Sequence, residues 1–543
     1  MKRLTIGAAL VLGACHDATG PSTAACIPGT TPPTLALNVG GVQALADPRA
    51  LACMSIGASA SPSEYVFVAA NASSGANQAA SYRIMSSFSV ATAAAPAPAV
   101  AASLFQPPDD GGVDLRLRTM ERRLLQLPGH ALSASVAAAP PNVGDTLHLR
   151  VPDANASNAC TSYFPIKAIV QAVTAHAIVV QDSAAPAGGF TLADFNAIGS
   201  EFETYSFPTD NTYFGAPTDL DGNGAVYLLY TPRVNALAPR GSGTFVGGFF
   251  FGGDLFSQLA CPESNVGEIV YLIAPDPSGV FSDPRATQFV RQATRSTVAH
   301  EVEHLINLGI RLQSGARFES IWLDEALAHF AEEYVGRAED GFGPFQKLTY
   351  SDVSANATDY QAFYRDKLLN LRSWLQRPDT GSSIANTDRN LSDGGAAWAL
   401  LHYAADQYAG GDLPGFTRRL VSGPDSGLGN LTARAGAPFD SLMAGWMVAM
   451  YADGLGISGL AARYTFQSWN FRDVEAALSG AYPLQVRALG SGADVTAAAY
   501  PGSGNYFRLL GTPTTPAAVF RLVSTAGGLV TFPGARLYIV RTQ

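Results

Sequence analysis

The chain has 543 residues, and its 34 basic and 44 acidic side chains give a formal net charge of −10. No surplus of Lys and Arg remains to neutralise phosphates, which excludes a protein that binds nucleic acid through a basic surface. Apolar residues make up 47% of the chain, so bulk disorder is excluded as well. The 54 glycines and 34 prolines exceed average usage and favour a turn-rich chain of several domains with much β-structure.

Residues 1–15 have the pattern of a bacterial lipoprotein signal peptide. After a basic start, an apolar run over residues 4–14 leads to small residues before Cys15, as a signal peptidase requires. The run is too short for a membrane-spanning helix, which needs about 20 residues. We therefore predict an exported lipoprotein of the bacterial envelope, held in the outer membrane or at the cell surface by a lipid on Cys15. The alternative is an ordinary secretory signal in which Cys15 lies near the cut by chance.

Four cysteines remain: Cys26, Cys53, Cys160 and Cys261. An even number of cysteines in an oxidising compartment favours disulfide bonds. Proximity in the sequence favours pairing Cys26 with Cys53 and Cys160 with Cys261, and the other arrangements stay open. Metal binding by these thiols is disfavoured, because no Cys-x-x-Cys spacing occurs in the chain.

The first folded unit is expected to be a small β-sandwich over residues 34–105. Before it, residues 16–33 are small, polar and proline-rich, which is typical of a tether. Strand-like runs at residues 35–39 and 65–69 then recur between clusters of Ser, Gly and Asn.

Residues 106–142 are interpreted as a linker that contains one helix. The segment 115–125 mixes apolar and charged residues as an amphipathic helix does. We expect its arginines on a solvated face rather than in a patch that binds phosphate or membrane.

Residues 143–480 carry strand patterns first and helical patterns later. Four apolar runs predict strands at residues 168–170, 177–180, 225–230 and 268–273. Helical patterns begin at Thr287, and this order is typical of an α+β catalytic domain whose active-site helix packs beneath a sheet. Residues 483–543 return to turn-rich β patterning and predict a second small β-domain. The expected fold class is thus α+β, a mixed sheet followed by a helical subdomain, flanked by small β-sandwich domains.

The motif His300-Glu301-x-x-His304 is the strongest chemical signal in the chain. Positions i and i+4 lie on one face of an α-helix, so two imidazoles can bind one zinc ion while the adjacent Glu reaches the zinc-bound water. The residues around the motif contain no Gly or Pro that would break this helix. The sequence therefore predicts a zinc site on a helix.

A catalytic zinc site needs a third protein ligand and an open position for water. A second helical pattern over residues 321–334 offers Glu325, and 20 residues separate it from His304, which suffices for a hairpin of two helices. The motif with a third His ligand does not fit, because its Gly and His positions are Asn307 and Ile310 here. We predict Glu325 as the third ligand.

Residues 300–304 followed by residues 322–333 resemble the gluzincin metallopeptidases, and most of all the hyicolysin family. Four further segments are similar to the layout of that family: residues 219–224, 247–250, 265–269 and 395–406. The resemblance covers residues 160–455.

The resemblance implies a zincin-like domain that acts as a zinc endopeptidase on proteins or peptides. Carried over residue by residue, it implies that His300, His304 and Glu325 bind zinc and that Glu301 is the catalytic base.

Two departures from the gluzincin pattern concern the surroundings of the zinc site. Gluzincins usually have Asn before the ligand Glu, where this chain has Asp324, and thermolysin-like relatives have Asp four residues after it, where this chain has His329. His329 could orient Glu325, approach the metal itself, or be a partly buried histidine without a role. For a transition-state donor, His402 and Tyr403 are the nearest candidates, although helical packing alone also explains them.

The segment that contains Asp219, Asp221 and Asn223 is similar to the start of an oxygen-rich calcium loop. Calcium is therefore a possible second cofactor. The twelfth position of such a loop is Tyr230 rather than Glu, which favours a simple turn before a strand.

The sequence thus predicts a zinc-dependent endopeptidase that hydrolyses peptide bonds of extracellular or envelope proteins. A competing hypothesis is a non-catalytic, surface-exposed binding lipoprotein with a degenerate protease domain. Glu301 favours catalysis, since a protein that only binds has no need of this residue. A further hypothesis keeps the zinc but makes the N-terminal segment a latency region that is removed on activation.

Overall fold

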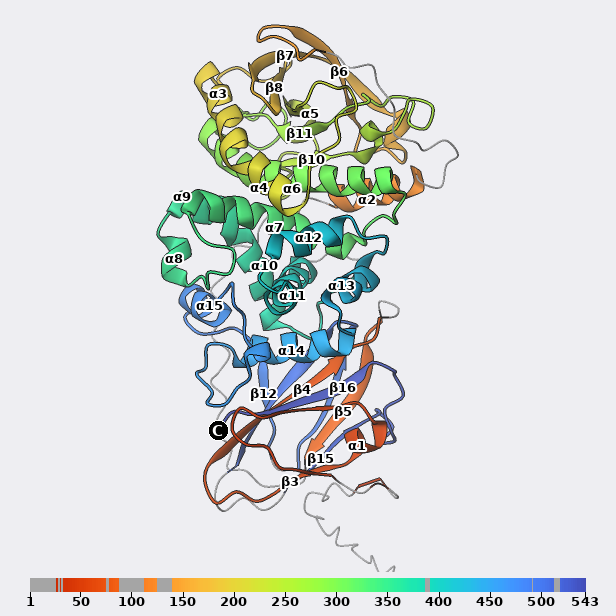
Figure 1. Cartoon of the computed structure of the whole chain (residues 1–543), viewed down its shortest axis with the longest axis vertical. Coiled ribbons are helices and arrows are strands. Elements are labelled where there is room, and N and C mark those ends of the chain that lie inside the picture. The colour runs from red at the N-terminus through yellow and green to blue at the C-terminus, as the bar shows by residue number, and fades with distance from the viewer. Residues whose placement is uncertain are drawn as a thin grey trace, which may run out of the picture.

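The structure is a computed structural model that describes residues 26–27, 30, 33–74, 78–86, 112–124, 139–385, 391–490, 492–511 and 518–543. Three tiers follow one another along the long axis of the molecule (Figure 1). A mixed sheet with short helices lies at one end, a helical region lies in the middle, and a β-sandwich lies at the other end. The predicted α+β character is confirmed at this level.

The mixed sheet has the strand order β10-β11-β9-β8-β7-β6. Its strands are β6 (Thr146–Pro152), β7 (Tyr163–Val173), β8 (Ala177–Asp182), β9 (Val226–Thr231), β10 (Gly248–Phe250) and β11 (Ile269–Ile273). Strands β8, β9 and β11 pair in parallel, and every residue of β11 is buried, as expected for a strand that is covered on both faces. The short strand β10 is antiparallel to β11 and forms one edge of the sheet.

Two long helices lie where this sheet meets the helical region. Helix α6 (Thr287–Ser314) packs against β10 and β11, and it ends at Gly315, whose positive φ of 67° suits a residue without a Cβ. Helix α7 (Ile321–Asp340) returns alongside α6 and ends at Gly341 in the same way. The predicted hairpin of two helices is therefore present.

The helical region is built mainly by α7, α10 (Arg365–Gln376), α11 (Leu391–Tyr408) and α14 (Phe439–Ala452), which pack against one another. Fully buried tryptophans fill its core: Trp374, Trp398, Trp446 and Trp469. The shorter helices here are α8 (Tyr350–Ser354), α9 (Ala357–Asp359), α12 (Leu413–Val421), α13 (Gly427–Ala435) and α15 (Phe471–Ser479). Helices α3 (Leu192–Glu201) and α5 (Pro232–Asn235) pack against the mixed sheet, and α4 (Phe207–Tyr213) packs against α6, α7 and α12.

The β-sandwich corrects the prediction of two separate β-domains over 34–105 and 483–543. Its sheets have the orders β1-β3-β15-β5-β13 and β12-β14-β4-β16-β2, so each sheet contains strands from both ends of the chain. The N-terminal elements are β1 (Thr34–Leu35), β2 (Val42–Leu45), α1 (Pro48–Ala52), β3 (Met54–Ile56), β4 (Ser63–Asn71) and β5 (Ala80–Ser86). The C-terminal strands are β12 (Val486–Ala488), β13 (Asp494–Ala499), β14 (Ser503–Gly511), β15 (Ala518–Val523) and β16 (Ala535–Arg541).

The physical reason for this pairing lies in β4, which is buried over nearly its whole length. A buried central strand needs a partner on each side, and β4 pairs with β14 on one side and with β16 on the other. Neither chain end alone supplies enough strands for two covered sheets. These paired strands are more than 400 residues apart in the sequence, so no local sequence pattern indicates that they pair.

The structure pairs Cys26 with Cys53 and Cys160 with Cys261, as the sequence analysis favoured. The signal peptide, Cys15 and most of the tether lie outside the described residues, and so does much of the linker 106–142. No helix in the described part of the chain is long and apolar enough to span a membrane.

The helix predicted in that linker is present as α2 (Val113–Leu124), but its arginines are not all solvated. The Arg118 side chain is 4% exposed and forms ion pairs with Asp114 and Glu121 on the same helix. The prediction of a solvated connector helix is therefore wrong for this face, because α2 packs against the sheet tier beside α6 (Figure 1).

Candidate metal centre

The two histidines of the predicted motif lie one turn apart on α6, and both direct Nε2 toward the same point. Their Nε2 atoms are 3.1 Å apart, and the rings are nearly perpendicular. The His304 side chain is fully buried, whereas that of His300 is 14% exposed.

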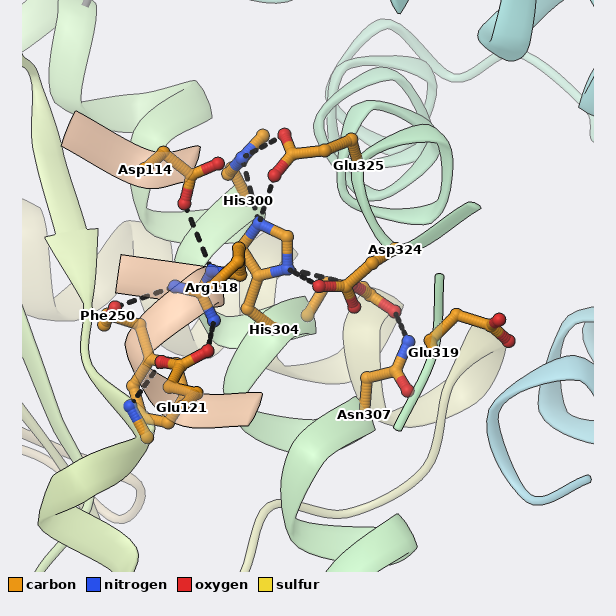
Figure 2. A network of polar contacts seen from close by, with 12 residues as sticks. Asp114, Arg118, Glu121, Phe250, His300, His304, Asn307, Glu319, Asp324 and Glu325 are labelled. Carbon is orange, nitrogen blue, oxygen red and sulfur yellow. Dashed lines mark hydrogen bonds and ion pairs between the residues drawn. The ribbon is translucent and has the colours of Figure 1, made fainter. Parts of the chain in front are cut away.

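Glu325 reaches this point from α7, as Figure 2 shows. Its Oε2 lies 3.6 Å from Nε2 of His300, and its Oε1 lies 3.7 Å from Nε2 of His304. Two ligands about 2.1 Å from one tetrahedral ion are themselves about 3.4 Å apart. The two nitrogens and the carboxylate therefore fit a tetrahedral zinc ion to within a few tenths of an ångström.

The other ring nitrogen of each histidine contacts a carboxylate. Nδ1 of His300 lies 2.8 Å from Oε1 of Glu332, and Nδ1 of His304 lies 3.3 Å from Oδ2 of Asp324. A proton on each Nδ1 leaves the lone pair of each Nε2 for a metal, which is the usual support of metal-binding histidines. Burial opposes the charge on Asp324, but His304 and Arg118 outweigh it and lower the pKa of this carboxyl.

Glu332 is the centre of a second cluster beside the metal site. Its carboxylate accepts from Nδ1 of His329 at 2.7 Å and from Nζ of Lys367 at 2.6 Å, in addition to His300. Although burial opposes ionisation, Lys367 and the histidines hold the pKa of Glu332 well below its usual range. Burial lowers the pKa of His329 to about 4, so this histidine is neutral at pH 7.

The charge around His300 favours a cation at this position. Burial acts to lower the pKa of His300, but the hydrogen bond to Glu332 and the charge of Glu301 outweigh it and raise the pKa to about 9. In the metal-free protein His300 is therefore protonated at pH 7. A metal ion that binds here must displace this proton, which makes metal affinity fall as the pH falls.

Glu301 belongs to the same helix turn as His300, but it is held apart from the group formed by the two histidines and Glu325. Its Oε2 accepts a hydrogen bond from the backbone N–H of Phe250 at 2.8 Å, and the residue is 6% exposed. Strand β10 thus fixes the carboxylate at the edge of the sheet, next to the site.

The site opens into a cleft with a volume of about 1230 Å³. Its walls come from the segment that leads into β10, from α6 and α7, and from α10 and the start of α11. Residues that line it include Gly247, Gly248, Thr297, Trp322, Asp366 and Asp393, together with His300, Glu301, Glu325, His329 and Glu332.

Helix α2 docks on the sheet edge beside this cleft, and Asp114 at its start lines the cleft near His300 (Figure 2). Arg118 donates to the backbone carbonyl of Phe250 at 2.7 Å, and Oε1 of Glu121 accepts from the N–H of Gly252 at 2.6 Å. These contacts attach α2 to the strand that positions Glu301. Removal of the N-terminal segment of about 130 residues, which includes α2, on activation stays a prediction.

The candidate transition-state donors His402 and Tyr403 do not reach the cleft, which corrects that expectation. The fully buried ring of His402 contacts Glu333 at 2.6 Å through Nε2 and Ser468 at 3.1 Å through Nδ1. The hydroxyl of Tyr403 donates to the carbonyl of Arg463. Both side chains thus belong to the core of the helical region, which explains their helical spacing.

Of the three possible calcium ligands, Asp219 and Asp221 lie close together, whereas Asn223 does not belong to their cluster. One ligand atom each of Asp219, Asp221 and Glu268 lies within 4.8 Å of the others. Asn223 instead donates from its amide to Oδ2 of Asp221 at 2.6 Å and accepts from the N–H of Ala225.

Two polar residues have positions around the site that the sequence did not predict, and Glu332 was expected only as a replacement ligand for Glu325. Glu332 could have been found, because it follows Glu325 by seven residues and therefore lies on the same helix face two turns later. Lys367 lies on α10, and no sequence pattern connects it with the motif.

Comparison with known proteins shows a partial similarity to a metalloprotease. The chain is 30% identical to the neutral metalloprotease ShpI of Staphylococcus hyicus over 137 residues, which cover 25% of this chain. The chain spans 29% of the length of that relative. No protein-family model matches the chain. One quarter of the chain is therefore similar to a metalloprotease, and the structure contains His and Glu groups that could hold a metal ion.

Proposed function

We propose that this protein is a zinc-dependent endopeptidase whose ligands are His300, His304 and Glu325. The observation that carries the proposal is the convergence of both Nε2 atoms and one carboxylate, with Glu301 held beside them. The partial similarity to a neutral metalloprotease supports the same conclusion.

A zinc ion bound here would supply a Lewis acid that activates water and polarises the carbonyl of a peptide bond. Glu301 then takes a proton from the attacking water and delivers it to the leaving amine, as a general base and acid. The N–H of Phe250 holds the carboxylate in place and takes up one of its oxygens. The other oxygen remains for proton transfer.

The part of the sheet edge at Gly247 and Gly248 suits an extended peptide as substrate, whereas Glu301 and Arg118 already bind the N–H and the carbonyl of Phe250. Among the described strands, β10 pairs only with β11, and Gly247 and Gly248 line the cleft. A peptide that adds to such an edge makes backbone hydrogen bonds that do not depend on its sequence. A side chain at Gly248 would clash, since a Cβ there would lie 2.6 Å from the carbonyl oxygen of Tyr271. This geometry supports a protein or peptide substrate.

Removal of the metal is expected to abolish peptide hydrolysis. We expect the purified protein to cleave casein or members of a peptide library, to lose this activity with a zinc chelator, and to regain it when zinc is restored. Mass spectrometry of the products would give the cleavage preference. A protein that binds zinc but cleaves no peptide would support the non-catalytic binding lipoprotein instead.

The proposed site of action is the outer surface of a bacterial envelope, with Cys15 as the lipid-anchored residue. Cys15→Ser is expected to release the mature protein from membrane pellets into the soluble fraction, because the acyl chains provide the membrane affinity. Immunoblots of the two fractions measure this shift. Equal pelleting of the wild type and the variant would contradict the lipid anchor.

A further inference from the structure

A cluster of carboxylates lies away from the zinc site, where the turn before β9 meets the start of β11. Asp219 and Asp221 belong to the turn, and Glu268 directly precedes β11. One oxygen atom of each lies within 4.8 Å of the other two. Asp219 is exposed and Asp221 is half-buried, so a cation could enter from solvent.

Glu268 provides the observation that points to a ligand. The residue is 1% exposed, and its Oε1 accepts from the N–H of Leu220 at 3.0 Å, but its buried Oε2 has no hydrogen-bond partner. Burial raises the pKa of Glu268, and the nearby Thr218 hydroxyl offsets part of this effect. That hydroxyl is itself buried without a hydrogen bond of acceptable geometry, so Oε2 stays unsatisfied.

No basic side chain among the described residues pairs with these three carboxylates. Their hydrogen bonds in the described part of the chain come from the backbone N–H groups of Leu220, Asn223 and Gly224 and from the Asn223 amide, and no ion pair with Lys, Arg or His is formed. Burial, followed by repulsion from Asp219 among other effects, raises the pKa of Asp221. A buried carboxylate without a partner is costly, and natural proteins pair such groups or use them to bind metal ions.

We propose that Asp219, Asp221 and Glu268 bind a calcium ion. The donors are oxygens only, which suits a hard cation and disfavours zinc, because zinc prefers nitrogen and sulfur ligands. Calcium accepts irregular sets of carboxylates and backbone carbonyls, whereas magnesium requires near-octahedral geometry. The site differs from the loop expected from the sequence, because Glu268 replaces Asn223 as the third side-chain ligand.

Such an ion would hold together segments that support the zinc centre. The N–H of Tyr227 in β9 donates to the carbonyl of Glu268, so the ion would lie where these two parallel strands begin. Thr218 in the same turn packs against Gly309 of α6, where a Cβ would lie only 2.8 Å from the threonine methyl. The calcium ion would therefore stabilise the contact between the sheet and the zinc-binding helix, without a part in the chemistry.

The test is a calcium titration of the full mature chain, dialysed against calcium-free buffer that contains zinc. We expect isothermal titration calorimetry to give about one calcium ion per chain, and Tm to rise with calcium concentration, because binding to the native state stabilises it. Magnesium at the same concentrations should raise Tm less. Absence of binding and of any calcium-dependent change in Tm in the wild type would overturn the proposal, as would an equal effect of magnesium.

Variants distinguish this site from adventitious binding. Glu268→Gln preserves the size of the side chain, and we expect it to raise the Kd for calcium at least about 10-fold, because the number of charged ligands sets affinity. Glu263→Gln is the matched control, since Glu263 lies five residues earlier in the same loop, is half-buried, and pairs with Arg150 rather than with the three carboxylates. If Glu268→Gln does not fold, the exposed Asp219→Asn serves in its place. Unchanged calcium binding in the variant that folds would overturn the assignment.

Zinc content separates this inference from the proposed peptidase function. The calcium variants are expected to retain zinc, because His300, His304 and Glu325 belong to other segments. Calcium binding in a protein that lacks peptidase activity would still support the calcium site, and peptidase activity without calcium binding would reject this site alone.

Discussion

Glu301→Gln is expected to lower kcat/KM for peptide hydrolysis by at least about 100-fold, while fold and zinc content stay near those of the wild type. The reason is the position of Glu301, whose Oε2 accepts from the N–H of Phe250 and which lies outside the group formed by His300, His304 and Glu325. The amide oxygen of Gln can accept the same hydrogen bond, so the side chain keeps its place. It cannot take a proton from water at neutral pH.

Three measurements make this test specific to proton transfer. They are the kcat/KM on a peptide cleaved by the wild type, the zinc content by elemental analysis, and the Tm. His304→Ala is the contrasting variant, since it is expected to lose zinc and activity together. Undiminished hydrolysis by Glu301→Gln would contradict the metallopeptidase assignment, because Glu301 is the residue to which that assignment gives the proton transfer.

The centre of the site could be predicted because its determinants are local. Spacing i, i+4 on a helix that lacks a breaker brings His300 and His304 together, and the length of the intervening segment permits Glu325 to reach them. Both helices are present with the expected hairpin. For these three residues, the positions predicted from the sequence agree with their positions in the structure.

The surroundings of the site could not be predicted, because they depend on segments that are distant in the sequence. Lys367 on α10 reaches Glu332 on α7, and Phe250 on β10 holds Glu301 on α6. His402 has the same residue type and helical spacing as a functional histidine, yet it is satisfied by Glu333 in the core. Only the tertiary structure distinguishes a histidine of the metal site from a histidine of the core.

The single β-sandwich could not be predicted for the same reason, because its strands pair between segments that are distant in the sequence. Each chain end carries a recognisable strand pattern, but a strand pattern does not specify its partner. Strand β4 needed two neighbours, and both came from the last 50 residues or so of the chain. Interleaving of the two ends also means that the N-terminal strands cannot leave the molecule without breaking both sheets, which weighs against release of that whole segment on activation.

Glu325→Ala is expected to remove most of the zinc from the purified protein and to abolish peptide hydrolysis with it. Two histidines alone do not make the three-ligand set of a catalytic zinc site, and alanine leaves the carboxylate position empty. The nearest replacement, Glu332, is already engaged by His300, His329 and Lys367.

The matched control is Glu332→Gln, which removes a carboxylate from the same face of α7 but leaves all three proposed ligands. By comparison with other residues that orient metal-binding histidines, we expect it to weaken zinc affinity about 10- to 100-fold rather than to abolish binding. Zinc titrations of both variants, with activity measured at saturating zinc, separate the two roles. If Glu325→Ala retained its zinc, the ligand would have to be Glu332 or His329, because Glu333 is buried against Arg337 and His402 and cannot turn toward the cleft.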